Sequence, residues 1–329
     1  MKRILDDQEN YMGINNCLDI DKNFLKKRNN TNIIPLRKRK KMKKIDEDFL
    51  NIDISKEEVE TIEEIKENFL SLKDKGPVIS VKPEKKNNAG AVGNTFEREM
   101  KVDENNRPGP DFKGWEFKTK RQISDSASSL FTQKPSNKGG DEYMRLNWGV
   151  SRSMIYDQGA KEYVEVMPDE GDGSFPPMHV LRTRVFNTKF RSYYEEGRVL
   201  RAFNDYPNKK YRIHLFDSNH NLIDDKIYFD FASLKEKSEG KLKNTVLCEA
   251  DEIEINGKIY FQYQSLQVFM GFRFENLLTC LEDGIAVYEH RHGRYKSGDK
   301  VGLKHNHGGG FRLINSKYFP RLFDGHFEI

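Results

Sequence analysis

The alternation of Glu116, Phe117 and Lys118 is the feature that most constrains the fold. On a β-strand, successive side chains point to opposite faces, so Glu116 and Lys118 would share one face while Phe117 enters the core. Asp111 comes earlier, and the Lys113-Gly114 pair predicts a tight turn that could bring it alongside, because glycine tolerates the backbone angles of a bend or bulge. The sequence therefore predicts a sheet with a polar cluster on one strand.

Two carboxylates and one lysine in this arrangement could share a metal ion and an attacking water. Asp111 and Glu116, with the main-chain carbonyl of Phe117, would hold Mg²⁺ through hard oxygen ligands. Lys118 would orient the water and favour loss of its proton, or offset the charge of a phosphate. The alternative is a solvated strand with an exposed ion pair, because one third of the chain is charged.

Length and composition indicate a soluble protein with a substantial core. The chain has 329 residues, enough for one large domain or two ordinary ones. It has no apolar run of about 18 residues and its start lacks the apolar stretch of a signal peptide, so a cytoplasmic location is expected. Cys17, Cys248 and Cys280 are odd in number and form no CxxC pair, which predicts reduced core residues rather than disulfides or a cysteine zinc site.

Charge is unevenly distributed along the chain. The net charge of +4 does not by itself require a nucleic acid partner. The densest basic run, residues 37–44, has little apolar content and predicts a disordered arm, which would either clamp a phosphate backbone or be a solvated tail. We expect residues 1–52 to be an accessory segment and residues 53–329 to form the folded domain.

The pattern along residues 53–329 predicts a mixed α/β (α+β) fold. A capping box at Ser55–Glu58 begins a helix, and a second helix is expected with Asn94 or Thr95 as its cap. The apolar side of the first helix comprises Val59, Ile62, Ile65, Phe69 and Leu72. Strands are expected at residues 77–81, 128–132, 180–186, 211–216 and 226–231 and on both sides of the Asn256-Gly257 turn, and helical segments from residue 231 and over residues 264–278.

A second group of polar residues lies near the C-terminus. On a strand, Glu289 and Arg291 would share one face and His290 and His292 the other. Arginine can donate two hydrogen bonds to guanine, and glutamate can accept one from cytosine N4. Glu289 and Arg291 are therefore suited to reading G·C pairs in the major groove.

His305, His307 and Arg312 flank the triple glycine at residues 308–310, which would let the backbone approach DNA closely. Two alternatives remain for the histidines. The two HxH pairs could surround a zinc ion, or individual imidazoles could be satisfied core groups.

Several motifs occur in a characteristic order from about residue 60 to the end. Pro110-Asp111 followed by Glu116-x-Lys118 resembles the PD…(D/E)xK signature of the restriction-endonuclease-like superfamily. The complete set of motifs comprises Gly90-x-x-Gly93-x-Thr95-x-Glu97, Glu104-Asn105, the PD…ExK site, Leu130-Phe131-Thr132-x-x-x-Pro135 and His305-x-His307-Gly308-x-Gly310-Phe311-Arg312. This set resembles the MvaI/BcnI family of type II restriction endonucleases.

This resemblance implies a fold like that of the mismatch-repair nickase MutH, with a mixed sheet flanked by helices. The catalytic part would comprise residues 53–150 plus C-terminal elements, and β-rich insertions in residues 150–329 would form a DNA-recognition lobe. The resemblance also implies a monomer that uses Mg²⁺, cleaves double-stranded DNA at a short G·C-flanked site and works with a cognate methyltransferase. Asp111, Glu116 and Lys118 would be catalytic, with Glu97 as a supporting acid.

The C-terminal motif would then read bases, whereas other basic residues would contact the DNA backbone. The backbone candidates are Lys120, Arg121, Arg294 and Tyr295; Lys120 and Arg121 could equally be ordinary surface charges. Two features depart from the family pattern, namely the basic N-terminal extension and the histidines at positions 290 and 292, where apolar strand residues are expected. A MutH-like nickase acting in repair and a DNA-binding protein without cleavage remain the alternative functions.

Overall fold

The computed structural model separates the chain into Met1–Lys44 and Ile45–Ile329. It describes residues 54–86, 88, 90–102, 109–122, 126–189, 195–306 and 308–329. The predicted accessory segment at 1–52, with its basic run and Cys17, lies outside these residues, as do Glu104, Asn105 and His307.

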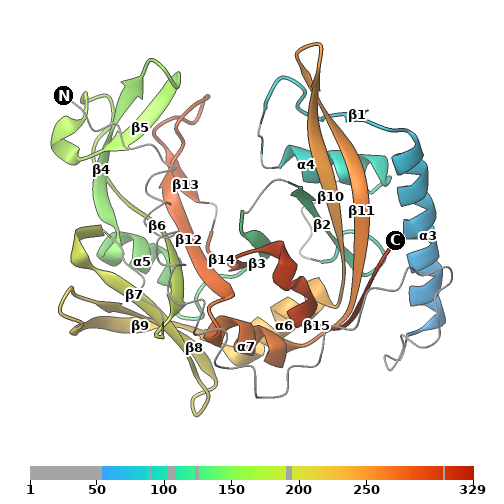
Figure 1. The fold of residues 1–329 in the computed structure, drawn as a ribbon. Coiled ribbons are helices and arrows are strands. Elements are labelled where there is room, and N and C mark those ends of the chain that lie inside the picture. Colours follow the sequence, from blue (N-terminus) through green and yellow to red (C-terminus); the bar gives the residue numbers. More distant parts are fainter. Residues whose placement is uncertain are drawn as a thin grey trace, which may run out of the picture. The chain divides into compact units, whose positions relative to one another are not determined.

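The described residues form two sheets, one of which has the strand order β1-β11-β10-β2, with β15 also paired to β11 (Figure 1). Its strands are β1 (Val78–Ile79), β2 (Trp115–Arg121), β10 (Asn244–Ile255), β11 (Lys258–Phe272) and β15 (Phe323–Glu328). The β10–β2 pair is parallel, whereas β1, β10 and β15 all run antiparallel to β11. The sheet is therefore mixed, as predicted, and the strand that carries Glu116 lies at its edge.

The predicted helix over residues 264–278 is wrong. Residues up to Phe272 belong to β11, and only then does α7 (Phe274–Glu282) begin. Leu266 and Val268 pack in one apolar cluster while Phe269 packs in the other. A strand that is buried on both faces loses the apolar–polar alternation by which strands are identified, so its sequence resembles that of a buried helix.

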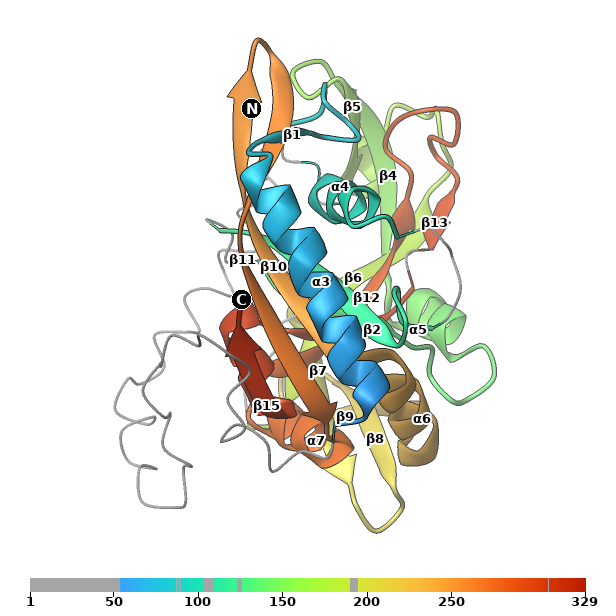
Figure 2. The same ribbon diagram turned by 90° about the vertical axis from the view of Figure 1, so that its right-hand side faces the viewer.

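Two helices accompany this sheet, α3 (Lys56–Asp74) and α4 (Ala91–Glu99). Figure 2 shows α3 lying along β10 and β11. The capping box at its start is present as predicted, and every residue of the predicted apolar side except Val59 is buried. The predicted cap of α4 is wrong, because the helix begins after Gly90. Thr95 lies inside it, where its hydroxyl donates to Ala91 O (2.6 Å) and accepts from the main-chain N–H of Val81 (3.1 Å).

The other sheet has the order β3-β14-β12-β6-β7-β8-β9, with β13 paired to β12, β4 to β6 and β5 to β4. Its strands are β3 (Ser128–Thr132), β4 (Val150–Asp157), β5 (Glu162–Val166), β6 (Met178–Asn187), β7 (Val199–Asp205), β8 (Lys210–Phe216), β9 (Leu222–Asp230), β12 (Ala286–Arg294), β13 (Lys304–Asn306) and β14 (Gly310–Leu313). Helices α5 (Gly140–Trp148) and α6 (Phe231–Leu242) lie between strands in the sequence. The strands predicted at residues 128–132, 180–186, 211–216 and 226–231 are thus confirmed, except that Phe231 already belongs to α6.

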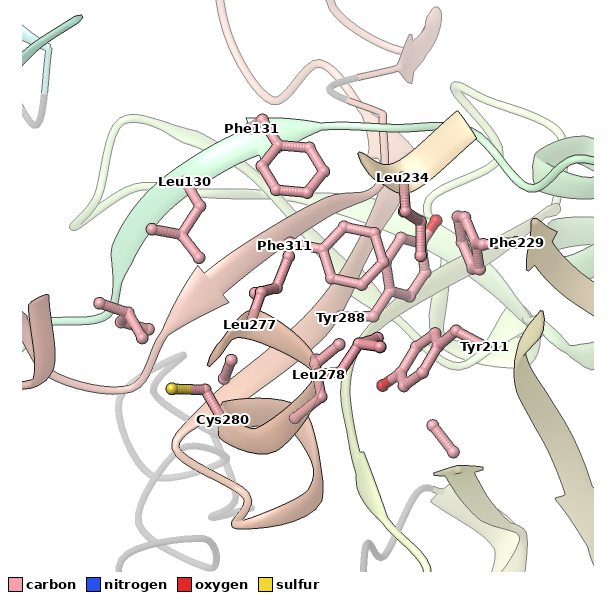
Figure 3. Packing of buried hydrophobic residues seen from close by; sticks show 14 of the residues in the cluster. Leu130, Phe131, Tyr211, Phe229, Leu234, Leu277, Leu278, Cys280, Tyr288 and Phe311 are labelled. Atoms are coloured by element: carbon pink, nitrogen blue, oxygen red, sulfur yellow. The ribbon is translucent and has the colours of Figure 1, made fainter. Parts of the chain in front are cut away.

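One of the two apolar clusters contains residues of both sheets. Its centre contains the rings of Tyr211, Phe229, Tyr288 and Phe311, which contact one another at centroid separations of 4.9 to 6.1 Å (Figure 3). Phe269 of β11 belongs to the same cluster, so the core extends from one sheet to the other.

The buried Cys248 and Cys280 are free thiols, as predicted. Among the described residues, no helix combines the length and the apolar character needed to cross a membrane.

Candidate active site

A tight turn places Asp111 beside β2. Lys113 and Gly114 both have positive φ (43° and 84°), which is the requirement for the two central residues of a hairpin turn of type I′. Phe112 and Trp115 exchange two main-chain hydrogen bonds across it (2.9 and 2.7 Å). As a result, Asp111 Oδ2 accepts a hydrogen bond from the N–H of Phe117 (2.8 Å).

Strand β2 then separates polar from apolar side chains as the alternation predicts. Phe117 packs against Phe96 and Phe112 in the core. On the other face, the Glu116 side chain is 3% exposed and Lys118 Nζ pairs with its Oε1. The structure thus brings Asp111, Glu116 and Lys118 together at one sheet edge. The alternative of a solvated strand with an exposed ion pair does not hold, because the carboxylate of Glu116 is buried.

Sequence reasoning missed a second lysine at this site. Lys241, in the last turn of α6, places its Nζ 2.6 Å from Glu116 Oε2 and 3.6 Å from Asp111 Oδ1. It also donates a hydrogen bond to the carbonyl of Gly109 (2.9 Å). No local pattern marks Lys241, because its position depends on the pairing of β10, which follows α6, with β2.

Burial and the neighbouring charges shift the pKa values of this group. Burial raises the pKa of Glu116 above its ordinary value; Lys118 opposes this shift, and the adjacent carboxylate of Asp111 adds to it. Burial alone would lower the pKa of Lys241, but its contacts with Glu116 and then Asp111 raise it. The ammonium of Lys241 is therefore held in its charged form by the two carboxylates.

The remaining candidates near β2 lie in different surroundings. Glu97, on α4, lines a pocket with Lys82, Asn94, Arg98 and Lys101. Lys120 is half-buried and shares the strand face of Glu116 and Lys118 by the two-residue repeat. Arg121 pairs with Glu252 (2.6 Å) and donates to the carbonyl of Asn88 (2.6 Å), so part of its hydrogen-bonding capacity is used within the protein.

A cluster of arginines surrounds Glu289 on β12. Its carboxylate lies 3.1 Å from Arg184 Nε, 3.5 Å from Arg291 Nε and 3.2 Å from Arg312 Nε. These arginines come from β6, β12 and β14, which are neighbours in the sheet. Glu289 is buried, whereas the Arg291 side chain is 40% exposed. Arg184 was not identified from the sequence, because only the strand pairing brings it opposite Glu289.

The opposite face of β12 lies in the interior. His290 and His292 are fully buried, as core residues would be, and the nitrogens of His290 lie 3.1 Å from Leu181 O and 3.2 Å from Asp141 O. Within the described residues, no group of three or more His, Cys, Asp or Glu side chains could surround a metal ion. The carbonyl contacts of His290 favour the structural interpretation over the zinc alternative for this residue.

Arg294, Tyr295 and His305 lie near the end of the same strand. Arg294 is buried and donates to the carbonyl of Pro176, so a contact between Arg294 and a DNA phosphate would require this side chain to leave the interior. Tyr295 and His305 are half-buried and their rings meet edge to face, with centroids 4.4 Å apart.

Comparison with solved structures identifies the fold as that of a restriction endonuclease. The structure described as "Restriction endonuclease MvaI-cognate DNA substrate complex" aligns with a TM-score of 0.67 and 24% identity, covering 84% of this chain and 99% of that chain. "Restriction endonuclease MvaI in the absence of DNA" gives a TM-score of 0.47 and 23% identity with the same coverage.

The family model of the MvaI/BcnI restriction endonuclease family matches residues 65–323. The chain therefore belongs to this family. A search of curated proteins finds no match to the chain.

Proposed function

We propose that this restriction endonuclease hydrolyses double-stranded DNA at a short G·C-flanked sequence, with Mg²⁺ and as a monomer. A cognate methyltransferase that protects the same sequence would be its partner in the cell. The observation that carries the proposal is the convergence of Asp111, Glu116 and Lys118 at one edge of the sheet in a chain of the MvaI/BcnI family.

The donor set fits a hard divalent cation. Asp111 and Glu116 supply carboxylate oxygens, and the carbonyl of Phe117 would add a third oxygen ligand. The ammonium of Lys241 already lies between the two carboxylates, so a positive charge is favourable at this position. When bound, Mg²⁺ would supply charge for the attacking water and for the phosphate oxygens.

The protein's own groups would position the reactants. Lys118, held by Glu116, would orient the attacking water and favour loss of its proton, or offset the charge of the phosphate. Glu97 would support this group as an additional acid. Lys120 and Arg121 would contact the DNA backbone, as would Arg294 and Tyr295 once the end of β12 adjusts to the duplex.

Base reading is assigned to the arginine cluster and the C-terminal motif. Arg291 and Arg312 would donate hydrogen bonds to guanine. Glu289, His305 and His307 would be the other base-reading residues. The burial of Glu289 beneath its arginines favours a role in orienting their guanidinium groups.

Digestion of unmethylated plasmid DNA tests the activity. We expect discrete fragments with Mg²⁺ and intact DNA with EDTA, and the ends should share one short G·C-flanked sequence. Because a monomer has one active site, nicked circles should appear before linear DNA. Nicked circles that persist would favour the repair nickase, and intact DNA that is nevertheless bound would favour the non-cleaving protein.

Asp111→Asn is the matched variant for this assay. It should abolish cleavage and leave DNA binding in a gel-shift assay largely intact, because the substitution removes the charge of a metal ligand and keeps its shape. Equal loss of binding and cleavage would contradict the assignment of Asp111.

A further inference from the structure

A lysine ammonium lies between the two carboxylates assigned to the metal. Lys241 Nζ is 2.6 Å from Glu116 Oε2 and 3.6 Å from Asp111 Oδ1. Its side chain is 20% exposed and that of Glu116 only 3%. Carboxylates that are buried and close together need a compensating positive charge. In the protein alone, Lys241 provides that charge together with Lys118.

The fold fixes Lys241 in this place. Helix α6 ends at Leu242, and β10 begins at Asn244, which pairs with Trp115 in parallel register. The last turn of α6 therefore lies beside the start of β2, next to Glu116. A cation in the last turn of a helix is also favoured by the helix dipole.

We propose that Lys241 is a built-in counter-cation that holds Asp111 and Glu116 in position before the divalent metal arrives and competes with that metal for both carboxylates. This inference rests on the proposed function, in which Asp111 and Glu116 are metal ligands. Lys118 also contributes positive charge, but it pairs with the other oxygen of Glu116, Oε1, and its proposed role is to orient the attacking water or offset the charge of the phosphate.

Competition of this kind links metal binding to DNA binding. Without DNA, a metal ion must displace the ammonium and remain close to it, and the like charges repel. A DNA phosphate at the site brings negative charge that favours both cations. The free protein should therefore bind Mg²⁺ weakly, and Lys241 should be a cause of that weakness.

Isothermal titration calorimetry of the full chain with Mg²⁺, in the absence of DNA, tests the proposal. Lys241→Gln should bind Mg²⁺ roughly tenfold more tightly than the wild type, a factor equal to about 1.4 kcal/mol. Lys241→Arg keeps the positive charge and should bind like the wild type. The matched control is Lys235→Gln on the same helix, where the lysine pairs with Glu239 (3.7 Å) and Glu275 (3.9 Å) instead; its affinity should not change.

A second measurement uses the wild-type chain, in case Lys241→Gln does not fold. Acylation of lysines, followed by mass spectrometry, should show that Lys241 becomes more reactive when Mg²⁺ is added, because its ammonium is released from the carboxylates. Lys235 should react equally with and without Mg²⁺. Unchanged reactivity of Lys241 in Mg²⁺-loaded protein would overturn the proposal.

The outcomes separate this inference from the proposed function. If the wild type binds Mg²⁺, Asp111→Asn does not, and Lys241→Gln binds as the wild type does, the metal site stands and the counter-cation role is refuted. If neither the wild type nor Lys241→Gln binds Mg²⁺ in the absence of DNA, the counter-cation role is refuted, and the Mg²⁺-dependent digestion of plasmid DNA alone decides the proposed function.

Discussion

At the scale of the residue, His290 illustrates how a polar group is accommodated in the core. Both of its ring nitrogens face main-chain carbonyls, those of Leu181 and Asp141. A neutral imidazole has one N–H and can donate to only one of them. Burial, and then the nearby His292, nevertheless lower the pKa of His290 to about 4, so the ring stays neutral in the folded protein at neutral pH.

This lowered pKa predicts a loss of stability in mild acid. The pKa of His290 in the folded state lies below the unfolded value of about 6.5, so the unfolded chain binds the proton first as the pH falls. The contribution of the neutral His290 to the free energy of unfolding is complete above pH 6.5. It declines by roughly 1.4 kcal/mol per pH unit toward pH 4. Urea unfolding at pH 7, 6 and 5 should show this slope.

His290→Gln should flatten the slope while lowering the stability at pH 7. His214 and His305, whose pKa values are also lowered by burial, should leave a residual slope. If the free energy of unfolding of His290→Gln depended on pH as steeply as that of the wild type, the buried imidazole of His290 would not titrate as described.

At the scale of the element, two turns with the same backbone conformation have different roles. Lys113-Gly114 leads into β2, and Asn256-Gly257 joins β10 to β11 in the same sheet. All four residues have positive φ, with 84° at Gly114 and 74° at Gly257. A Cβ added at either glycine would meet no atom within 4 Å, so the cost of a substitution is confined to the backbone.

Gly114→Ala and Gly257→Ala should each destabilise the protein by about 1 kcal/mol, because residues with a Cβ disfavour this conformation. Only Gly114→Ala should slow DNA cleavage, since the turn at Lys113-Gly114 holds Asp111 against the N–H of Phe117. Urea unfolding and plasmid digestion of both variants give the comparison. Similar cleavage rates for the two would mean that the turn does not position Asp111.

Local patterns predicted those parts of the site that depend on local structure. The alternation at Glu116, Phe117 and Lys118 and the turn before it use backbone rules that act over a few residues. The contact of Lys241 with Glu116 depends instead on the register between β10 and β2, which no short segment specifies. The helix predicted over residues 264–278 failed for a related reason, because tertiary packing buries both faces of β11.

At the scale of the whole molecule, the two sheets carry different tasks in the proposed function. The sheet with β2 holds the carboxylates and lysines, and the sheet with β6, β12 and β14 holds the arginine cluster around Glu289. A shared core joins them. Substitutions in the arginine cluster should therefore change the choice of sequence, whereas substitutions in the carboxylate group should change cleavage.

Arg291→Ala should weaken binding to the preferred site by about 1 to 3 kcal/mol, the usual cost of a lost bidentate contact with a base, and should weaken binding to random DNA much less. Arg273→Ala is the matched control: Arg273 is also exposed and pairs with a carboxylate, that of Asp324, but it lies outside the cluster. Gel-shift titrations on specific and random duplexes at one salt concentration give, for each variant, the ratio of its affinity for the preferred site to its affinity for random DNA. A loss of equal size on both duplexes would make Arg291 a phosphate contact, and base reading would then rest on Arg312 and the rest of the C-terminal motif.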